Sequence, residues 1–226
     1  MKKLVNTILR IITMDVILVS VLFVAAFFLF GYVAHEIVGE DDNAFDEKIF
    51  SFFNLHSPPL FISIMHVLTF FGTMTFILPA YILLIGFLLF KHRRTEAVNI
   101  AIIAITSTAL MFGLKEFYKR QRPELPLFKA ANNFSFPSGH ALCSFILCSV
   151  FIYIIWRSQI SKKWKWIFAV LLVLFSIAIG ISRIVLRYHY ASDVLAGLYL
   201  GFVWASMALW LERKLIPRKL ERQLDV

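Results

Sequence analysis

The chain has 226 residues, of which 60% are hydrophobic and 16% charged, and its mean hydropathy is +0.78. This balance excludes an ordinary soluble domain and predicts an integral membrane protein. The net charge of +9 does not indicate nucleic-acid binding, because the basic residues flank apolar runs and form no continuous stripe. Neither a linker nor an internal repeat divides the sequence, so residues 1–226 are expected to form a single domain.

Six uncharged apolar runs approach the length of about 20 residues that a membrane helix needs. They are 16–34, 73–90, 97–114, 141–156, 167–182 and 194–211. The stretch 58–71 would be only about 21 Å long as a helix, shorter than a ~30 Å hydrocarbon core. The sequence therefore predicts an all-α, polytopic membrane bundle of six transmembrane helices, with a short interfacial or re-entrant helix at 58–71.

Charge decides the orientation that we expect for these spans. With the N-terminus in the cytoplasm, six spans leave most of the 23 Lys and Arg residues on the cytoplasmic side. A seventh full span at 58–71 would reverse every later loop and abolish this bias. We therefore expect a multi-pass protein of the cell membrane with both termini in the cytoplasm.

The first motif is K-E-F-Y-K-R-Q-R-P at 115–123, after the third span. Lys115 and Arg122 are seven residues apart, so both would lie on one face, together with Lys119, if the helix continued to Pro123. Contact with lipid headgroups would account for part of this charge. Because positive charge normally collects in the cytoplasm and this cluster is predicted outside, an anionic ligand is the better explanation.

The second motif is P-S-G-H at 137–140, at the start of the run 141–156. Ser138 offers a hydroxyl group, and Gly139 would let a ligand approach the backbone closely. Free N–H groups and the helix dipole at a helix start favour a bound phosphate. Taken alone, however, the motif is equally well explained as an ordinary helix start with an interfacial histidine, His140.

The third motif is S-R-I-V-L-R-Y-H-Y-A-S-D at 182–193. His189 and Asp193 are four residues apart, so Asp193 can accept a hydrogen bond from one ring nitrogen and leave the other as a nucleophile. Arg183 and Arg187 add positive charge. A purely structural Asp–His pair is the alternative, but it does not explain why three separate membrane rims carry residues suited to phosphate.

Together these motifs resemble the three-part signature of the type 2 phosphatidic acid phosphatase (PAP2) superfamily, over about residues 115–193. The resemblance implies that His189 attacks phosphorus, that Asp193 orients it, and that His140 protonates the leaving oxygen and then activates water. It also implies that no metal or other cofactor takes part. The residues that it implies as phosphate ligands are Lys115, Arg122, Ser138, Gly139 and Arg183.

In size the chain resembles small bacterial members of this family, which implies a phospholipid or isoprenoid phosphate as substrate. Phosphatidylglycerophosphate is our first expectation and undecaprenyl diphosphate the alternative. A lipid transporter or flippase is a remote alternative, because the centres of the six spans carry no charge. Gly197 and Gly201 indicate close helix packing, either within one chain or between protomers, so the oligomeric state stays open. Four residues outside the motif remain candidate headgroup contacts: Lys119, Arg120, Arg187 and Tyr188.

Overall fold

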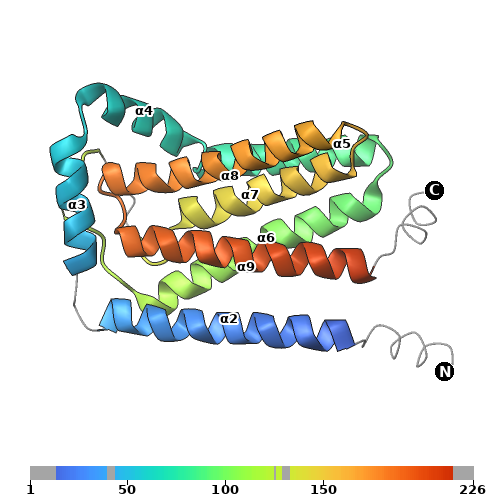
Figure 1. Ribbon diagram of the computed structural model, residues 1–226, viewed down its shortest axis with the longest axis horizontal. Helices are drawn as coiled ribbons and strands as arrows, with labels where there is room; N and C mark the ends of the chain where they lie inside the picture. Colours follow the sequence, from blue (N-terminus) through green and yellow to red (C-terminus); the bar gives the residue numbers. More distant parts are fainter. Residues whose placement is uncertain (1–13, 40–43, 125, 129–132, 216–226) are drawn as a thin grey trace.

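The computed structural model describes residues 14–39, 44–124, 126–128 and 133–215. These residues form eight α-helices and no strand (Figure 1). The helices are α2 (Met14–Gly39), α3 (Ala44–His56), α4 (Pro59–Phe70), α5 (Met74–Phe90), α6 (Arg94–Tyr118), α7 (Gly139–Arg157), α8 (Lys162–Val185) and α9 (Ala191–Leu215).

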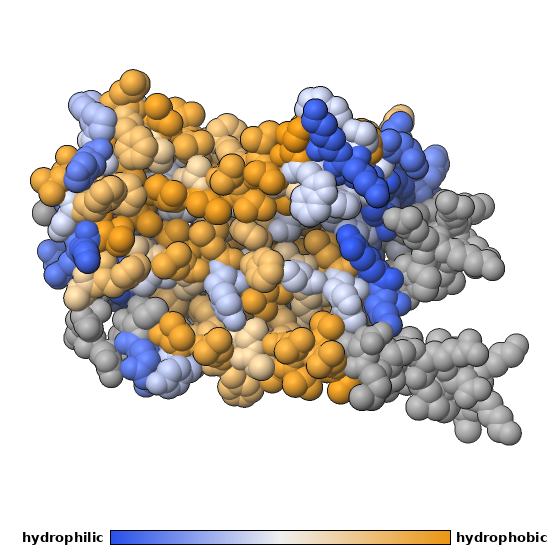
Figure 2. All heavy atoms as spheres, in the orientation of Figure 1, coloured by the Kyte–Doolittle hydropathy of each residue, from blue (hydrophilic) through white to orange (hydrophobic). Residues whose placement is uncertain are grey.

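Five of these helices, α2, α6, α7, α8 and α9, are long and apolar enough to cross a membrane. The helices α4 and α5 give a sixth candidate when they are taken together as one span, with a short break and a bend of 44° between them. Figure 2 shows an apolar belt across the middle of the molecule and hydrophilic residues toward its two ends. The prediction of an all-α polytopic membrane bundle is confirmed.

The short helix α4 lies within the predicted range 58–71, and it packs beside the end of α8. Met65 of α4 forms a buried cluster with Val185, Leu186 and Tyr188. The sequence did not predict α3, which contains no long apolar run. This helix lies across the end of the bundle where α8 ends and α9 begins (Figure 1).

Glycines bring α9 against α7. A Cβ atom added to Gly197 would lie 2.6 Å from the carbonyl oxygen of Ser138, and one added to Gly201 would lie 3.1 Å from that of Leu142. Close packing within one chain therefore accounts for this G-x-x-x-G pattern. The same contact brings two of the motifs together, since the amide of Ser138 donates a hydrogen bond to the backbone carbonyl of Asp193 at 3.0 Å.

The first turn of α2 and the last turn of α9 lie at the same end of the bundle, opposite α3 (Figure 1). The chain therefore crosses the bundle an even number of times between them, as predicted. The residues that precede Met14 and follow Leu215 lie outside the described residues, as do the positions of the termini themselves.

Candidate active site

The structure brings the three motifs together at the end of the bundle that α3 covers. Each motif lies where a spanning helix begins or ends. Lys115 is in the last turn of α6, Ser138 to His140 begin α7, Arg183 is in the last turn of α8, and Asp193 is in the first turn of α9. Arg122 and His189 lie in the connections between these helices.

The prediction that the helix continues to Pro123 is wrong. Helix α6 ends at Tyr118, and Lys119 adopts a left-handed conformation, with φ of 48°, while its amide bonds to the carbonyl oxygen of Lys115. This cap turns the chain out of the helix. Arg122 therefore approaches the site from a loop, and Lys119 is exposed.

Arg122 is held by neutral acceptors. Its Nε donates to the carbonyl oxygen of Asn133 at 2.8 Å, and its Nη1 donates to that of Tyr188 at 2.7 Å. Its Nη2 bonds the side-chain oxygen of Asn133. Burial lowers the pKa of Arg122 from its ordinary value, and nearby Asp193 opposes this shift.

Lys115 and Arg183 are also bound to neutral groups. The ammonium of Lys115, which is 5% exposed, donates to the carbonyl oxygens of Phe134 at 2.5 Å and Ser135 at 3.3 Å. Arg183 donates from Nη1 to the hydroxyl of Thr69 on α4 at 2.6 Å, and its guanidinium lies 4.2 Å from the ring centre of Tyr188. Within the described residues, no carboxylate forms an ion pair with Lys115, Arg122 or Arg183.

The contacts of His189 indicate which ring nitrogen carries the lone pair. Nη1 of Arg122 lies 3.3 Å from Nε2 of His189, and a guanidinium can only donate. Nε2 must therefore carry the lone pair and Nδ1 the proton. Nδ1 faces Oδ2 of Asp193 at 3.5 Å and the hydroxyl of Ser135 at 3.2 Å. This is the tautomer that a histidine nucleophile needs.

Ser135 links His189 to Asp193. Its hydroxyl donates to Oδ2 of Asp193 and lies near the Nδ1–H of His189, so it can accept from the ring while it donates to the carboxylate. Asp193 also accepts from the amide of Tyr190 at 2.9 Å and from Arg120 at 2.8 Å. The carboxylate is 0% exposed, and these donors offset part of the cost of burying it.

Burial and positive charge keep His189 neutral. Desolvation lowers the pKa of His189 well below 6.5, and the charges of Arg183, Arg122 and Lys115 lower it further. Because the histidine lies so close to cations, protonation would add a fourth positive charge to a buried site. The ring is therefore available as a neutral base or nucleophile at neutral pH.

His140 lies at the start of α7, within electrostatic reach of His189, Arg183, Arg122 and Lys115. Its Nε2 is buried and has no hydrogen-bond partner within the part of the chain that the structure describes. Gly72, at the break between α4 and α5, lies against this ring, because an added Cβ would be 2.7 Å from Cδ2 of His140. The arrangement leaves Nε2 free to exchange a proton with a ligand.

Ser138 and Gly139 begin α7 as predicted. The hydroxyl oxygen of Ser138 accepts from the amide of Ala141 at 3.5 Å, which leaves its own proton for another acceptor. The close neighbour of Gly139 is Met111 of α6, whose sulfur would be 3.3 Å from an added Cβ. Close packing against α6 therefore explains why a glycine stands at this position, and no ligand is needed to explain it.

A cavity of about 400 Å³ opens at Lys115 and Arg122, with Glu116 also in its lining, whereas His140, His189 and Arg183 are not part of that lining. An apolar groove of about 500 Å³ lies between α5 and α6. Its lining includes Ile85 of α5 and Phe112 of α6. Phe112 lines both spaces, so the cavity at Lys115 and Arg122 adjoins the groove at this residue. The pair of spaces can accommodate an anionic group joined to a hydrocarbon chain.

Sequence reasoning missed several residues of the site. Asp46 on α3, Thr69 on α4 and Ser135 each bond a motif residue or its partner. Arg120, expected as a headgroup contact, forms ion pairs with Asp46 and Asp193 and has a side chain that is only 9% exposed. Arg187 instead bonds Asn54 on the exposed surface. Among these residues, only Ser135 could have been found from its place in the sequence, because it lies two positions before Pro137 of the P-S-G-H motif.

Comparison with known proteins identifies the family. A family model described as the PAP2 superfamily matches residues 96–217. A phosphatidylglycerophosphatase B of Bacillus subtilis is 30% identical over 183 residues, which cover 80% of this chain and 89% of that protein. An undecaprenyl-diphosphatase of Sulfolobus acidocaldarius is 25% identical over 198 residues, which cover 83% and 88%.

A solved structure shares the fold. The crystal structure of a transmembrane PAP2-type phosphatidylglycerolphosphate phosphatase from Bacillus subtilis superposes with a TM-score of 0.74 at 28% identity. The superposition covers 82% of this chain and 93% of that one. With the family model matching more than half of the chain, the protein belongs to the PAP2 superfamily and is a membrane lipid phosphatase.

Proposed function

We propose that this phosphatase hydrolyses the phosphomonoester of a phospholipid, with phosphatidylglycerophosphate converted to phosphatidylglycerol as its main reaction. The relative at 30% identity carries the name of that activity and aligns over most of both chains. The observation that carries the chemistry is a set of three cations, Lys115, Arg122 and Arg183, that surround His189 and bond only neutral partners among the described residues.

In the proposed first step, Nε2 of His189 attacks phosphorus. A P–N bond forms, the P–O bond to the lipid breaks, and His140 gives a proton to the leaving oxygen. Asp193 holds His189 and stabilises the positive ring. The phosphate ligands Lys115, Arg122 and Arg183, with Ser138 and the backbone of Gly139, stabilise charge on the equatorial oxygens.

In the second step, His140 takes a proton from water, and the resulting hydroxide attacks the phosphohistidine. The P–N bond breaks, and inorganic phosphate leaves with His189 restored. No cofactor enters either step, because cationic side chains supply the charge that a metal ion supplies in other phosphoryl-transfer sites.

The cavity and groove that meet at Phe112 support a lipid substrate. The headgroup phosphate would lie at Lys115 and Arg122, and a hydrocarbon chain would lie between α5 and α6. Undecaprenyl diphosphate is the second candidate, because a relative at 25% identity carries that activity in its name and a single long chain also fits an apolar groove.

Phosphate release by the purified protein in detergent tests the reaction and the substrate. We expect the highest kcat/KM with phosphatidylglycerophosphate, lower values with undecaprenyl diphosphate and phosphatidic acid, and full activity in EDTA. The matched control is His189→Ala, which should release no phosphate. A preference for undecaprenyl diphosphate would overturn the substrate, and activity that EDTA removes and Mg²⁺ restores would overturn the metal-free mechanism.

The proposed orientation places the active site at the extracytoplasmic face and both termini in the cytoplasm. The distribution of Lys and Arg supports it. In a background without Cys143 and Cys148, a membrane-impermeant maleimide applied from outside should label a cysteine at exposed Phe128 and not one at exposed Lys162. The reverse pattern would invert the topology.

A further inference from the structure

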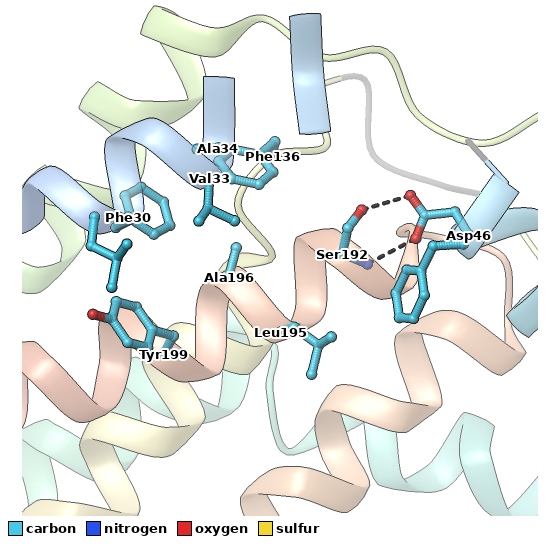
Figure 3. Close-up of a pocket in the computed structure, with 11 residues that line it drawn as sticks. Phe30, Val33, Ala34, Asp46, Phe136, Ser192, Leu195, Ala196 and Tyr199 are labelled. Atoms are coloured by element: carbon cyan, nitrogen blue, oxygen red, sulfur yellow. Dashed lines mark hydrogen bonds between the residues drawn. The ribbon is translucent and has the colours of Figure 1, made fainter. Parts of the chain in front are cut away.

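Helix α3 buries a carboxylate against the active site. Asp46 is 3% exposed, whereas its neighbours Phe45 and Glu47 are exposed. Oδ1 of Asp46 accepts from the amide of Ser192 at 2.8 Å, and Oδ2 accepts from the hydroxyl of Ser192 at 2.6 Å. Figure 3 shows these two bonds at one end of an apolar pocket of about 390 Å³ between α2 and α9. Asp46 thus caps the first turn of α9 from another helix.

Arg120 joins this carboxylate to Asp193. Its Nη2 bonds Oδ2 of Asp46 at 3.0 Å, and its Nη1 bonds Oδ1 of Asp193 and the hydroxyl of Ser192, each at 2.8 Å. The guanidinium also lies 4.1 Å from the ring centre of Tyr190. Burial alone would lower the pKa of Arg120, but the two carboxylates reverse that effect and raise it, so the guanidinium stays charged.

These contacts act on the side of Asp193 that faces away from His189. Arg120 occupies Oδ1, while Oδ2 remains for Ser135, the amide of Tyr190 and Nδ1 of His189. Asp46 in turn holds Arg120 in place and neutralises part of its charge. Neither residue lines the cavity that contains Lys115 and Arg122.

We propose that Asp46 and Arg120 are positioning residues for catalysis: they fix the carboxylate of Asp193, which then holds His189 in line for attack on phosphorus. This inference rests on the proposed function, since it requires His189 to be the nucleophile. Because the hydrogen bonds described above join the two residues to each other, to Ser192 and to Asp193, and not to the cations Lys115, Arg122 and Arg183, the loss of either residue should slow attack and leave substrate binding unchanged. In metal sites, removing the outer partner of an oriented histidine costs about 10- to 100-fold, and we expect a similar loss here.

The test measures phosphohistidine formation in a His140→Ala background, where the covalent intermediate should accumulate. Protein is mixed with ³²P-labelled 4-nitrophenyl phosphate, which needs little proton donation to its leaving group, and is quenched in alkali over time. Asp46→Asn and Arg120→Lys should each lower the limiting rate of labelling about 10- to 100-fold. The half-saturating substrate concentration and the final amplitude should not change. Glu47→Gln, an exposed carboxylate on the same helix, is the matched control and should label like the reference.

Rate and amplitude separate positioning from folding, because only folded protein contributes to the amplitude. A full rate with a reduced amplitude in both variants would assign Asp46 and Arg120 a purely structural role. An unchanged rate and amplitude, or a changed half-saturating concentration alone, would also overturn the inference. Failure of the His140→Ala reference itself to carry label on histidine would instead contradict the proposed function.

Discussion

The two ends of the bundle both bury ionic side chains, but they balance the charge differently. At the end opposite the active site, Glu96 pairs with Arg93 and Arg157, and Glu212 pairs with Arg157 and accepts a hydrogen bond from Tyr153. At the active-site end, Asp46 and Asp193 share Arg120, whereas Lys115, Arg122 and Arg183 bond carbonyl and hydroxyl groups.

We interpret this difference as one between charge that holds the fold together and charge that serves the proposed reaction. A buried ion pair whose members neutralise each other connects helices and needs no ligand. Three buried or half-buried cations without a carboxylate partner in the described residues repel one another, and an anion between them would relieve that repulsion. A phosphoryl group meets this requirement, and its transition state develops charge on oxygens that these cations can reach.

Replacing one arginine at each end should give the largest contrast. Arg183→Met should lower kcat/KM by about 10²–10³, because a donor to the phosphoryl oxygens is lost. Its folding stability should change little, since no carboxylate is left unpaired. Arg157→Met should lower folding stability by about 3 kcal/mol, because Glu96 and Glu212 lose a partner, while activity per folded molecule stays normal.

Thermal unfolding in detergent and phosphate release on the same preparations check this pair. If Arg183→Met unfolds as readily as Arg157→Met, the charge at the active-site end is structural after all. If Arg157→Met loses catalytic rate at full folding, the two ends are coupled and the comparison fails.

A smaller effect is expected at Thr69, the neutral partner of Arg183. Thr69→Val keeps the shape of the side chain and removes the hydroxyl that accepts from the guanidinium, so kcat/KM should fall about tenfold, equivalent to ~1.4 kcal/mol. Thr69→Ser retains the acceptor and should stay within about twofold of the wild type. Loss of activity in Thr69→Ser with none in Thr69→Val would show that the methyl group of Thr69 matters and its hydroxyl does not.

The smallest effect that we expect is a shift in the acidic limb of the pH profile of kcat/KM. His189 must be neutral to attack, and burial with three nearby cations lowers its pKa well below 6.5, so the acidic limb of the profile should lie below pH 6.5. Arg122→Gln removes one of those cations and should move the limb upward, at a lower overall rate. A wild-type limb at or above pH 6.5 would show that His189 is not held neutral in this way.

The sequence was sufficient for five of the spans and for placing the three motifs at one end of the bundle, whereas the sixth candidate span consists of α4 and α5 together. Long apolar runs report membrane helices directly, and because successive spans run in opposite directions, the ends of α6 and α8 and the starts of α7 and α9 come to one face. The contact of His189 with Asp193 also followed from a spacing of four residues, although His189 lies in the turn before α9 rather than on the helix.

The sequence was not sufficient for the residues that hold the motifs in place. Asp46 and Arg120 are 74 residues apart, and Thr69 and Arg183 are 114 apart, so no local pattern connects them. Helix α3 has no apolar run to mark it, and its one buried carboxylate resembles any acidic residue near a membrane surface. The end of α6 at Tyr118 was missed because Lys119 carries no glycine-like signal for a left-handed cap.

The central claim is that His189 carries the phosphoryl group. Rapid alkaline quenching of His140→Ala protein with a labelled phosphate ester of low leaving-group pKa should trap label on His189, because water activation is slowed and P–N bonds survive in alkali. His189→Ala protein should carry no label. Label on serine, or on His140 in the wild type, would contradict the assignment of the nucleophile.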